Sequence, residues 1–289
     1  MSKLLVIADV KGDGIATPRG LELANKLGLN AEVYAFVYAP LSRLKVTAAE
    51  KAAIKKRLLA EREAEVGSRI SKFSRDDQKV KLKVLWEKDV ADWVSKKCSK
   101  SNYQMVVKTG SQTESFAHAS TDWQLLRECP APVVIVAEKK WRRTHLVMAA
   151  LDLGSRLSAK KKLNADILRR AIELADAMSA NLEIISAVEV PTLLDDLDLI
   201  DTHSYVEDAK EDMAPHVRAL SKQFAIPEKN FVVKRGPVEK VIASQAAGRR
   251  AQIVVMGTVG RKGVKAKLIG NTAERVLTHL KTDILALKP

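Results

Sequence analysis

The chain has 289 residues, of which 46% are hydrophobic and 4% aromatic, and a formal net charge of +14. This length suffices for two domains of ordinary size, each with an aliphatic core. No apolar run approaches the length of a membrane span, so we expect no membrane insertion. The basic residues are dispersed, with Lys160, Lys161 and Lys162 in a predicted loop, and no aromatic-laced basic stripe favours a nucleic-acid partner.

In chain order, short apolar runs alternate with helical patterns. In the first half we expect strands at 4–9, 31–37, 80–85, 103–108 and 133–137, and helices at 18–27, 47–73, 90–98 and 121–127. In the second half we expect strands at 147–152, 181–188, 231–234, 252–256 and 284–287, and helices at 165–178, 201–224, 237–247 and 272–279. Alternation of short buried strands with helices predicts a parallel sheet covered by helices on both faces.

The two halves match each other as copies of one unit. The first strand of each half is a hydrophobic run that ends in an aspartate, Asp9 or Asp152. A polar segment at 138–143 separates the copies, so we expect domains at 1–138 and 144–289. The two cysteines, Cys98 and Cys129, sit far apart and form no CxxC pair, which indicates a reducing cytoplasm.

A glycine pattern stands between the fourth strand and the last helix of the second half. Gly257, Gly260 and Gly270 follow the spacing G-x2-G-x9-G, and Asn271 and Thr272 come directly after them. Glycines let backbone N–H groups approach phosphate oxygens, and a helix N-terminus adds unpaired donors and a favourable dipole. The pattern is neither a P-loop nor the dinucleotide fingerprint. It predicts a nucleotide phosphate site in the C-terminal half.

This pattern, the run 254–258 that leads into it and the Gly236-Pro237 pair resemble the universal stress protein family. The family's nucleotide-binding pattern is G-x2-G-x9-G followed by Ser or Thr, and Asn271 takes that last place here. The resemblance covers both halves and is greatest to the tandem, two-domain type. It implies two open, Rossmann-like parallel sheets of the adenine nucleotide alpha hydrolase type, joined as an internal pseudo-dimer through their last strands. Ligands of such sheets bind at the carboxyl ends of the strands, where the strand order switches.

The resemblance also implies which residues hold the ligand. Asp152 would accept hydrogen bonds from the adenine or ribose, and Val188 would offer backbone groups to the adenine ring. An alternative role for Asp152 is to cap the following helix or turn. The complete implied set is Asp152, Val188, Met256, Gly257, Gly260, Gly270, Asn271 and Thr272.

The first half lacks the glycine pattern. Gly110 stands where we expect the counterpart of Gly257, Thr113 replaces the second glycine, and Ala119 or Ser120 replaces the third. A Cβ atom at these places obstructs close approach of the backbone. We therefore expect no nucleotide in the first half, or a different ligand.

These observations predict a cytoplasmic stress-response protein that binds ATP or a related adenine nucleotide, with or without Mg²⁺, in its C-terminal domain. No nucleophile elbow and no metal-ligand spacing of histidines supports a catalytic or metal site, so we expect a non-enzymatic regulator or interaction protein. Two alternatives stay open: a slow ATPase, because a bound triphosphate needs little beyond positioning, and a scaffold for a lipid-like or phosphorylated small molecule. The sequence names no protein partner and leaves a homodimer open.

Overall fold

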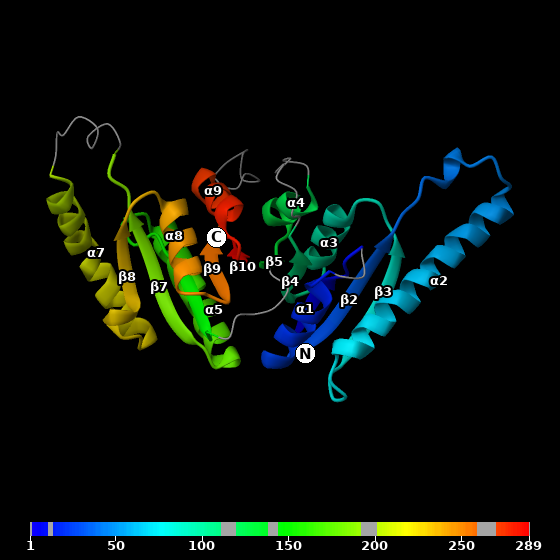
Figure 1. The fold of residues 1–289 in the computed structure, drawn as a ribbon, viewed down its shortest axis with the longest axis horizontal. Coiled ribbons are helices and arrows are strands. Elements are labelled where there is room, and N and C mark those ends of the chain that lie inside the picture. The colour runs from blue at the N-terminus through cyan, green and yellow to red at the C-terminus, as the bar shows by residue number, and fades with distance from the viewer. Residues whose placement is uncertain are drawn as a thin grey trace. The chain divides into compact units, whose positions relative to one another are not determined.

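The computed structural model describes residues 2–10, 14–110, 120–137, 144–191, 201–258 and 270–288. The chain divides into two compact units, Met1–Lys139 and Lys140–Pro289. Each unit is an open, parallel sheet of five strands with helices packed on both faces (Figure 1), which confirms the predicted α/β fold class. No helix of the described segments is long and apolar enough to cross a membrane.

The N-terminal unit places its first strand in the middle of the sheet. Its strands pair in parallel in the order β3-β2-β1-β4-β5. The strands are β1 (Lys3–Ile7), β2 (Asn30–Val37), β3 (Val80–Trp86), β4 (Tyr103–Thr109) and β5 (Val133–Val136). The helices are α1 (Ala16–Lys26), α2 (Ala48–Phe73), α3 (Val90–Ser99) and α4 (Thr121–Glu128), with a 3₁₀ turn η1 at Leu41–Arg43.

The C-terminal unit repeats this arrangement. Its strands pair in parallel in the order β10-β9-β6-β7-β8. The strands are β6 (Leu146–Ala150), β7 (Asn181–Val188), β8 (Phe231–Arg235), β9 (Ile253–Gly257) and β10 (Asp283–Leu287). The helices are α5 (Ser158–Met178), α7 (Thr202–Phe224), α8 (Val238–Gly248) and α9 (Asn271–His279), with a 3₁₀ turn η2 at Glu228–Asn230.

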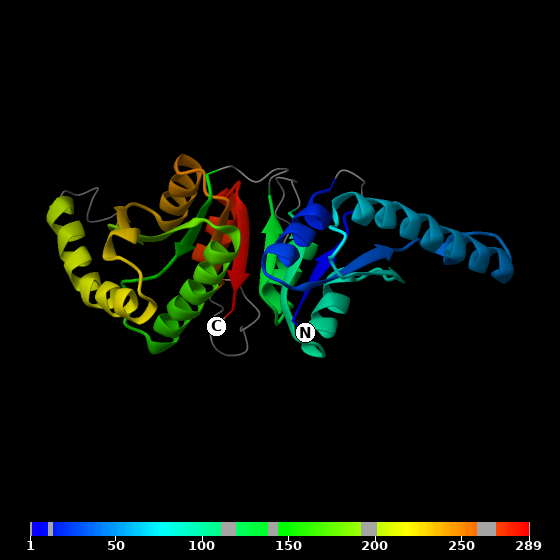
Figure 2. The same cartoon turned by 90° about the horizontal axis from the view of Figure 1, so that it is seen from below.

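The strand order explains where the helices lie. In each unit the first two connections run in one direction along the sheet, and the last two run in the other. Right-handed crossovers therefore place the two pairs of helices on opposite faces. In the N-terminal unit α1 packs on α2 and α3 packs on α4, and Figure 2 shows α5 (green) and α8 (orange) on opposite sides of the C-terminal sheet. The order switches between β1 and β4 in one unit, and between β6 and β9 in the other.

Helix α5 shows how the aliphatic core is built. Its buried apolar residues repeat at helical spacing and face β6 and β9; they are Leu163, Ile167, Leu168, Ala171, Leu174, Ala175 and Met178. The helix ends at Ser179, which adopts a left-handed conformation with φ of 50°. It begins at Ser158 rather than at 165, so the three lysines at 160–162 lie in its first turns and not in a loop.

A half-buried polar cluster sits among the strands of the N-terminal unit. The Glu32 carboxylate accepts hydrogen bonds from the hydroxyl of Tyr34 at 2.8 Å, from the hydroxyl of Tyr103, and from Lys3 Nζ at 3.1 Å. Burial alone would raise the pKa of Glu32, but the three donors together lower it to about 2. The cluster therefore holds a charged carboxylate inside the unit.

The two cysteines meet in space, although they sit far apart in the sequence. Cys98 lies in α3 and Cys129 directly follows α4, and these two helices pack together. Both cysteines are buried, and the two do not form a disulfide. The hydrogen bond between the two thiols, together with burial, raises the pKa of Cys98 far above its usual range.

Candidate functional site

A cavity of about 470 Å³ opens at the carboxyl ends of β6, β7 and β9 in the C-terminal unit. Its walls also include residues of α5, α8 and α9. This volume is typical of small-molecule sites, and the place is the switch point between β6 and β9. Five of the residues predicted from the sequence line it: Asp152, Met256, Gly257, Gly270 and Thr272.

The remaining predicted residues are Val188, Gly260 and Asn271. Val188 is buried and does not line the cavity, although its neighbours Ala187 and Glu189 do. The Val188 carbonyl accepts a hydrogen bond from the Gly236 N–H at 2.9 Å. Gly260 lies outside the described residues. Asn271 begins α9, and its side chain also lies outside what the structure describes.

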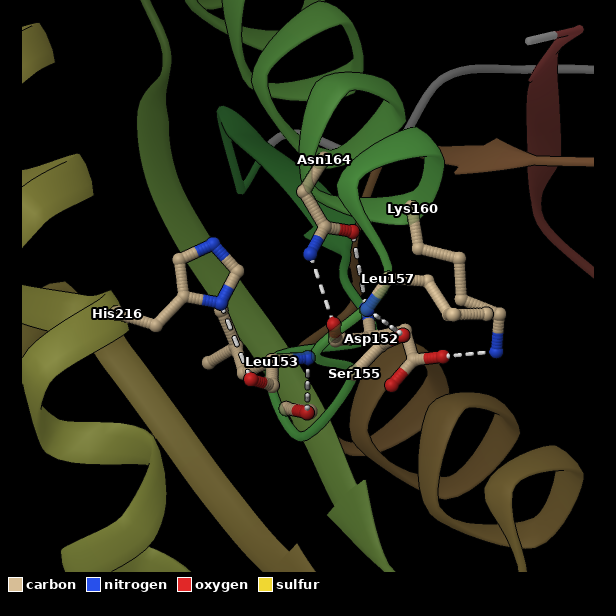
Figure 3. A network of polar contacts seen from close by, with 8 residues as sticks. Asp152, Leu153, Ser155, Leu157, Lys160, Asn164 and His216 are labelled. Carbon is tan, nitrogen blue, oxygen red and sulfur yellow. Dashed lines mark hydrogen bonds and ion pairs between the residues drawn. The ribbon is translucent and has the colours of Figure 1, made fainter.

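A buried amide holds the backbone of Asp152 in place (Figure 3). Asn164 Oδ1 accepts the Asp152 N–H at 3.1 Å, and Asn164 Nδ2 donates to the Asp152 carbonyl at 2.8 Å. Asn164 itself is 2% exposed. The amide thus satisfies both backbone groups of Asp152, which lines the cavity.

The carboxylate of Asp152 pairs with a lysine of α5. Lys160 Nζ lies 2.6 Å from Asp152 Oδ2, and the two side chains are 36% and 50% exposed (Figure 3). Both residues line the cavity. The sequence analysis missed Lys160 and Asn164 as site residues. A polar Asn among the apolar positions of α5 was the available signal, since a buried polar side chain needs a partner.

The packing of α5 on β9 requires a glycine at position 257. A Cβ atom at this position would lie 2.6 Å from Leu163 Cδ2 and 3.2 Å from Ile167 Cδ1. The end of β9 can therefore pass under α5 only as a glycine, or after a shift of Leu163. The backbone at this edge of the cavity stays bare.

The first turn of α9 lies at the cavity. Its N-cap is Gly270, and no side chain of the described residues caps the helix. The first intrahelical bond runs from the Glu274 N–H to the Gly270 carbonyl at 2.9 Å, so the preceding N–H groups have no helical acceptor. Gly270 and Thr272 line the cavity. An uncapped helix N-terminus at a cavity is suited to an anion.

A carboxylate caps the start of the neighbouring helix, α8. The Glu189 carboxylate accepts the N–H of Val238, the first residue of α8, at 3.1 Å. Glu189 therefore supplies the negative charge that this helix N-terminus favours. The sequence analysis also missed this residue. Within the described residues, no such side-chain cap is present at the start of α9.

Strand register corrects one prediction about the N-terminal unit. Val106 pairs with Leu5 of β1, the strand that leads to Asp9. Val254 pairs with Met148 of β6, the strand that leads to Asp152, and Leu5 and Met148 lie equally far before these aspartates. Counted from these pairs, Thr109 takes the place of Gly257, and Gly110 takes the place of Thr258. The backbone bonds agree, because the N–H groups of Gly110 and Thr258 donate to the last residues of β5 and β10. The prediction that Gly110 is the counterpart of Gly257 is wrong.

In the N-terminal unit, the residues that correspond to Asp152 and Gly270 cap helices. The Asp9 carboxylate accepts the N–H of Ala16 at 3.0 Å and so caps α1, the alternative role considered for Asp152. Ser120 stands at the N-cap of α4, as Gly270 does in α9, and its hydroxyl accepts the Trp123 N–H at 3.5 Å. Both helix starts that could receive an anion there are already capped.

Comparisons with known proteins agree with this architecture. The sequence model described as "Universal stress protein family" matches residues 160–288. Universal stress protein E of Photorhabdus laumondii is 31% identical over 217 residues, which are 73% of this chain and 69% of the relative. Universal stress protein E of Escherichia coli K12 is 28% identical over 296 residues, covering 99% of this chain and 93% of the relative.

Solved structures of similar fold extend over the whole chain. A functionally unknown protein from Pseudomonas aeruginosa PAO1 has a TM-score of 0.71 at 21% identity and covers 100% of this chain and 93% of its own. A universal stress protein from Archaeoglobus fulgidus has a TM-score of 0.67 at 17% identity, covering 99% and 98%. At these identities the structures show the fold alone, while the sequence relatives confirm the predicted tandem type. The chain belongs to the universal stress protein family.

Proposed function

We propose that the C-terminal unit binds ATP or a related adenine nucleotide, and that the protein acts as a non-enzymatic regulator in the stress response. One observation supports this most: the open first turn of α9 lines a cavity at the switch point of the sheet. The corresponding helix of the N-terminal unit, α4, differs because the side chain of Ser120 caps its start.

The residues of the cavity fit the parts of a nucleotide. The N–H groups at the start of α9 would receive a phosphate, and Gly257 lines the cavity beside them. The Asp152 carboxylate can accept hydrogen bonds from hydroxyl groups of a sugar. Apolar side chains from three elements, Leu151, Ile185 and Ile242 among them, would pack on a base.

The test compares two matched substitutions at helix N-caps. Gly270→Asp places a good capping carboxylate at the start of α9, which keeps the helix but fills and repels the phosphate position. Ser120→Asp makes the same change at the start of α4. Calorimetry with ATP, ADP and AMP, with and without Mg²⁺, should show one site in the wild type, loss of ATP binding in Gly270→Asp, and no change in Ser120→Asp.

The proposal fails if the wild type binds no adenine nucleotide, or if Gly270→Asp binds ATP as the wild type does. Phosphate release measured in the same samples decides between a binding protein and a slow ATPase. The internal pseudo-dimer, the domain boundaries and the cytoplasmic location stay predictions from the sequence.

A further inference from the structure

A second cavity, of about 370 Å³, lies in the N-terminal unit, between α1, α2 and the end of β1. Helix α1 contacts both α2 and β1. The polar and charged residues of its lining are Asp9, Thr17 of α1, and Arg62, Glu65, Ser68, Arg69 and Lys72 of α2. This cavity is in the other unit from the candidate nucleotide site and shares no residue with it.

Thr17 places an unsatisfied hydroxyl in the cavity wall. The residue is 0% exposed, and its Oγ1 has no hydrogen-bond partner among the residues that the structure describes. A residue with left-handed backbone follows each of the helices α1 and α5, namely Gly28 with φ of 64° and Ser179 with φ of 50°. Thr17 and Leu168 lie the same number of residues before them, so the two take corresponding positions in the two units. Leu168 is also 0% exposed. A hydroxyl thus stands where the sister unit has an apolar side chain, and a buried hydroxyl costs stability unless it finds a partner.

Arg62 is held in place by the protein itself. It is 7% exposed, donates to the backbone carbonyls of Asp9 and Val10, and pairs with Glu65 at 2.7 Å. The Asp9 carboxylate is turned to the start of α1, where it accepts the Ala16 N–H. The two carboxylates that line the cavity, Asp9 and Glu65, therefore each have a partner within the protein.

Arg69 and Lys72 keep their charge available. Arg69 Nε is buried without a hydrogen-bond partner. The Arg69 guanidinium and Lys72 Nζ lie 5.8 Å and 5.7 Å from the ring centre of Phe73. Within the described segments neither side chain forms an ion pair with a carboxylate. A buried guanidinium nitrogen without an acceptor is costly, and an oxyanion is the partner that its planar donors match best.

We propose that this cavity binds a phosphate group, either as inorganic phosphate or as part of a small phosphorylated metabolite. Arg69 and Lys72 supply the positive charge, and Thr17 donates its hydroxyl hydrogen. The volume exceeds what one phosphate fills, so an ester of small size fits as well. The N-terminal unit is then an anion-binding domain whose site lies apart from the position of the family's glycine loop.

The test uses calorimetry at constant ionic strength on the Gly270→Asp protein, so that the start of α9 does not contribute. The probes are inorganic phosphate, glycerol 3-phosphate and, for comparison, sodium chloride. Arg69→Gln removes the charge, and Thr17→Val removes the hydroxyl while keeping its shape. Arg57→Gln is the matched control, since Arg57 lies on the same helix, is 81% exposed and pairs with Glu61 away from the cavity.

We expect one saturable phosphate site, roughly tenfold weaker or more in Arg69→Gln, clearly weaker in Thr17→Val and unchanged in Arg57→Gln, as loss of one charge-assisted hydrogen bond predicts. Tighter binding of glycerol 3-phosphate would identify a metabolite, and equal binding would identify the phosphate group alone. The proposal is overturned if neither probe binds saturably, or if Arg57→Gln weakens binding as much as Arg69→Gln. It is also overturned if Thr17→Val raises the unfolding temperature and leaves phosphate binding intact.

Discussion

Replacement of Lys160 by methionine tests how the candidate nucleotide site distinguishes a phosphorylated ligand from a bare nucleoside. Lys160 pairs with Asp152 at 2.6 Å at the mouth of the cavity. A nucleotide phosphate would compete with the Asp152 carboxylate for this lysine, and the freed carboxylate could then accept a hydrogen bond from the sugar. Methionine keeps much of the length and packing of the side chain and removes its charge.

The structure sets the expected magnitudes. Since the two side chains are 36% and 50% exposed, the ion pair contributes at most about 1 kcal/mol to the free energy of unfolding, and the variant should stay folded. A hydrogen bond from a charged donor to the bound phosphate is worth about 1.5–3 kcal/mol. Because 1.4 kcal/mol is a factor of ten, ATP should bind roughly ten- to a hundredfold more weakly. Adenosine, which has no phosphate, should bind with unchanged or higher affinity.

Calorimetry with ATP and adenosine on Lys160→Met measures both quantities. Lys161→Met is the control, because Lys161 is the adjacent residue of α5, is exposed and does not line the cavity. An unchanged ATP affinity in Lys160→Met would refute the reasoning. So would an equal loss for ATP and adenosine, which would indicate a distorted cavity and not a lost phosphate contact.

Three further predictions concern stability and reactivity. Gly257→Ala should reduce the free energy of unfolding by about 1–3 kcal/mol and so lower the unfolding temperature measured by calorimetry, because the new methyl group would meet Leu163 at 2.6 Å. An unchanged unfolding temperature would contradict this. Cys98 and Cys129 should react with a disulfide reagent at pH 8 only in denaturant, because burial and their mutual hydrogen bond disfavour the thiolate; prompt labelling of the native protein would count against it. The pKa of Glu32 falls from 4.5 to about 2 on folding, so the charged carboxylate stabilises the fold above pH 4.5 and this stabilisation is lost as the pH falls towards 2. Glu32→Gln should therefore flatten the acid unfolding curve in that window, and a curve parallel to that of the wild type would exclude the effect.

The order of the elements was predictable because the signals are local. Hydrophobic runs and helical spacing place nearly every strand and helix of both units within a few residues of its observed bounds. The largest difference is the start of α5. Its first two turns hold three lysines, and nothing in a solvated basic segment distinguishes an exposed helical turn from a loop.

The candidate site was predictable only in part. The glycine spacing and the family resemblance indicated five residues that line the cavity. Asn164, Lys160 and Glu189 were missed, because each acts on a partner supplied by another segment or by a backbone group. Such pairings depend on how a helix is rotated and seated against a strand end, which spacing along the chain does not record.

The sequence by itself determined the duplicated α/β architecture and the family, because these depend on periodicity and on residues close together in the chain. Tertiary structure decided the rest. It showed that Asp9 caps a helix while Asp152 faces a cavity, that Thr109 takes the place of Gly257, and that two distant cysteines touch. These outcomes depend on strand register and helix packing, where a shift of one residue changes which atoms meet.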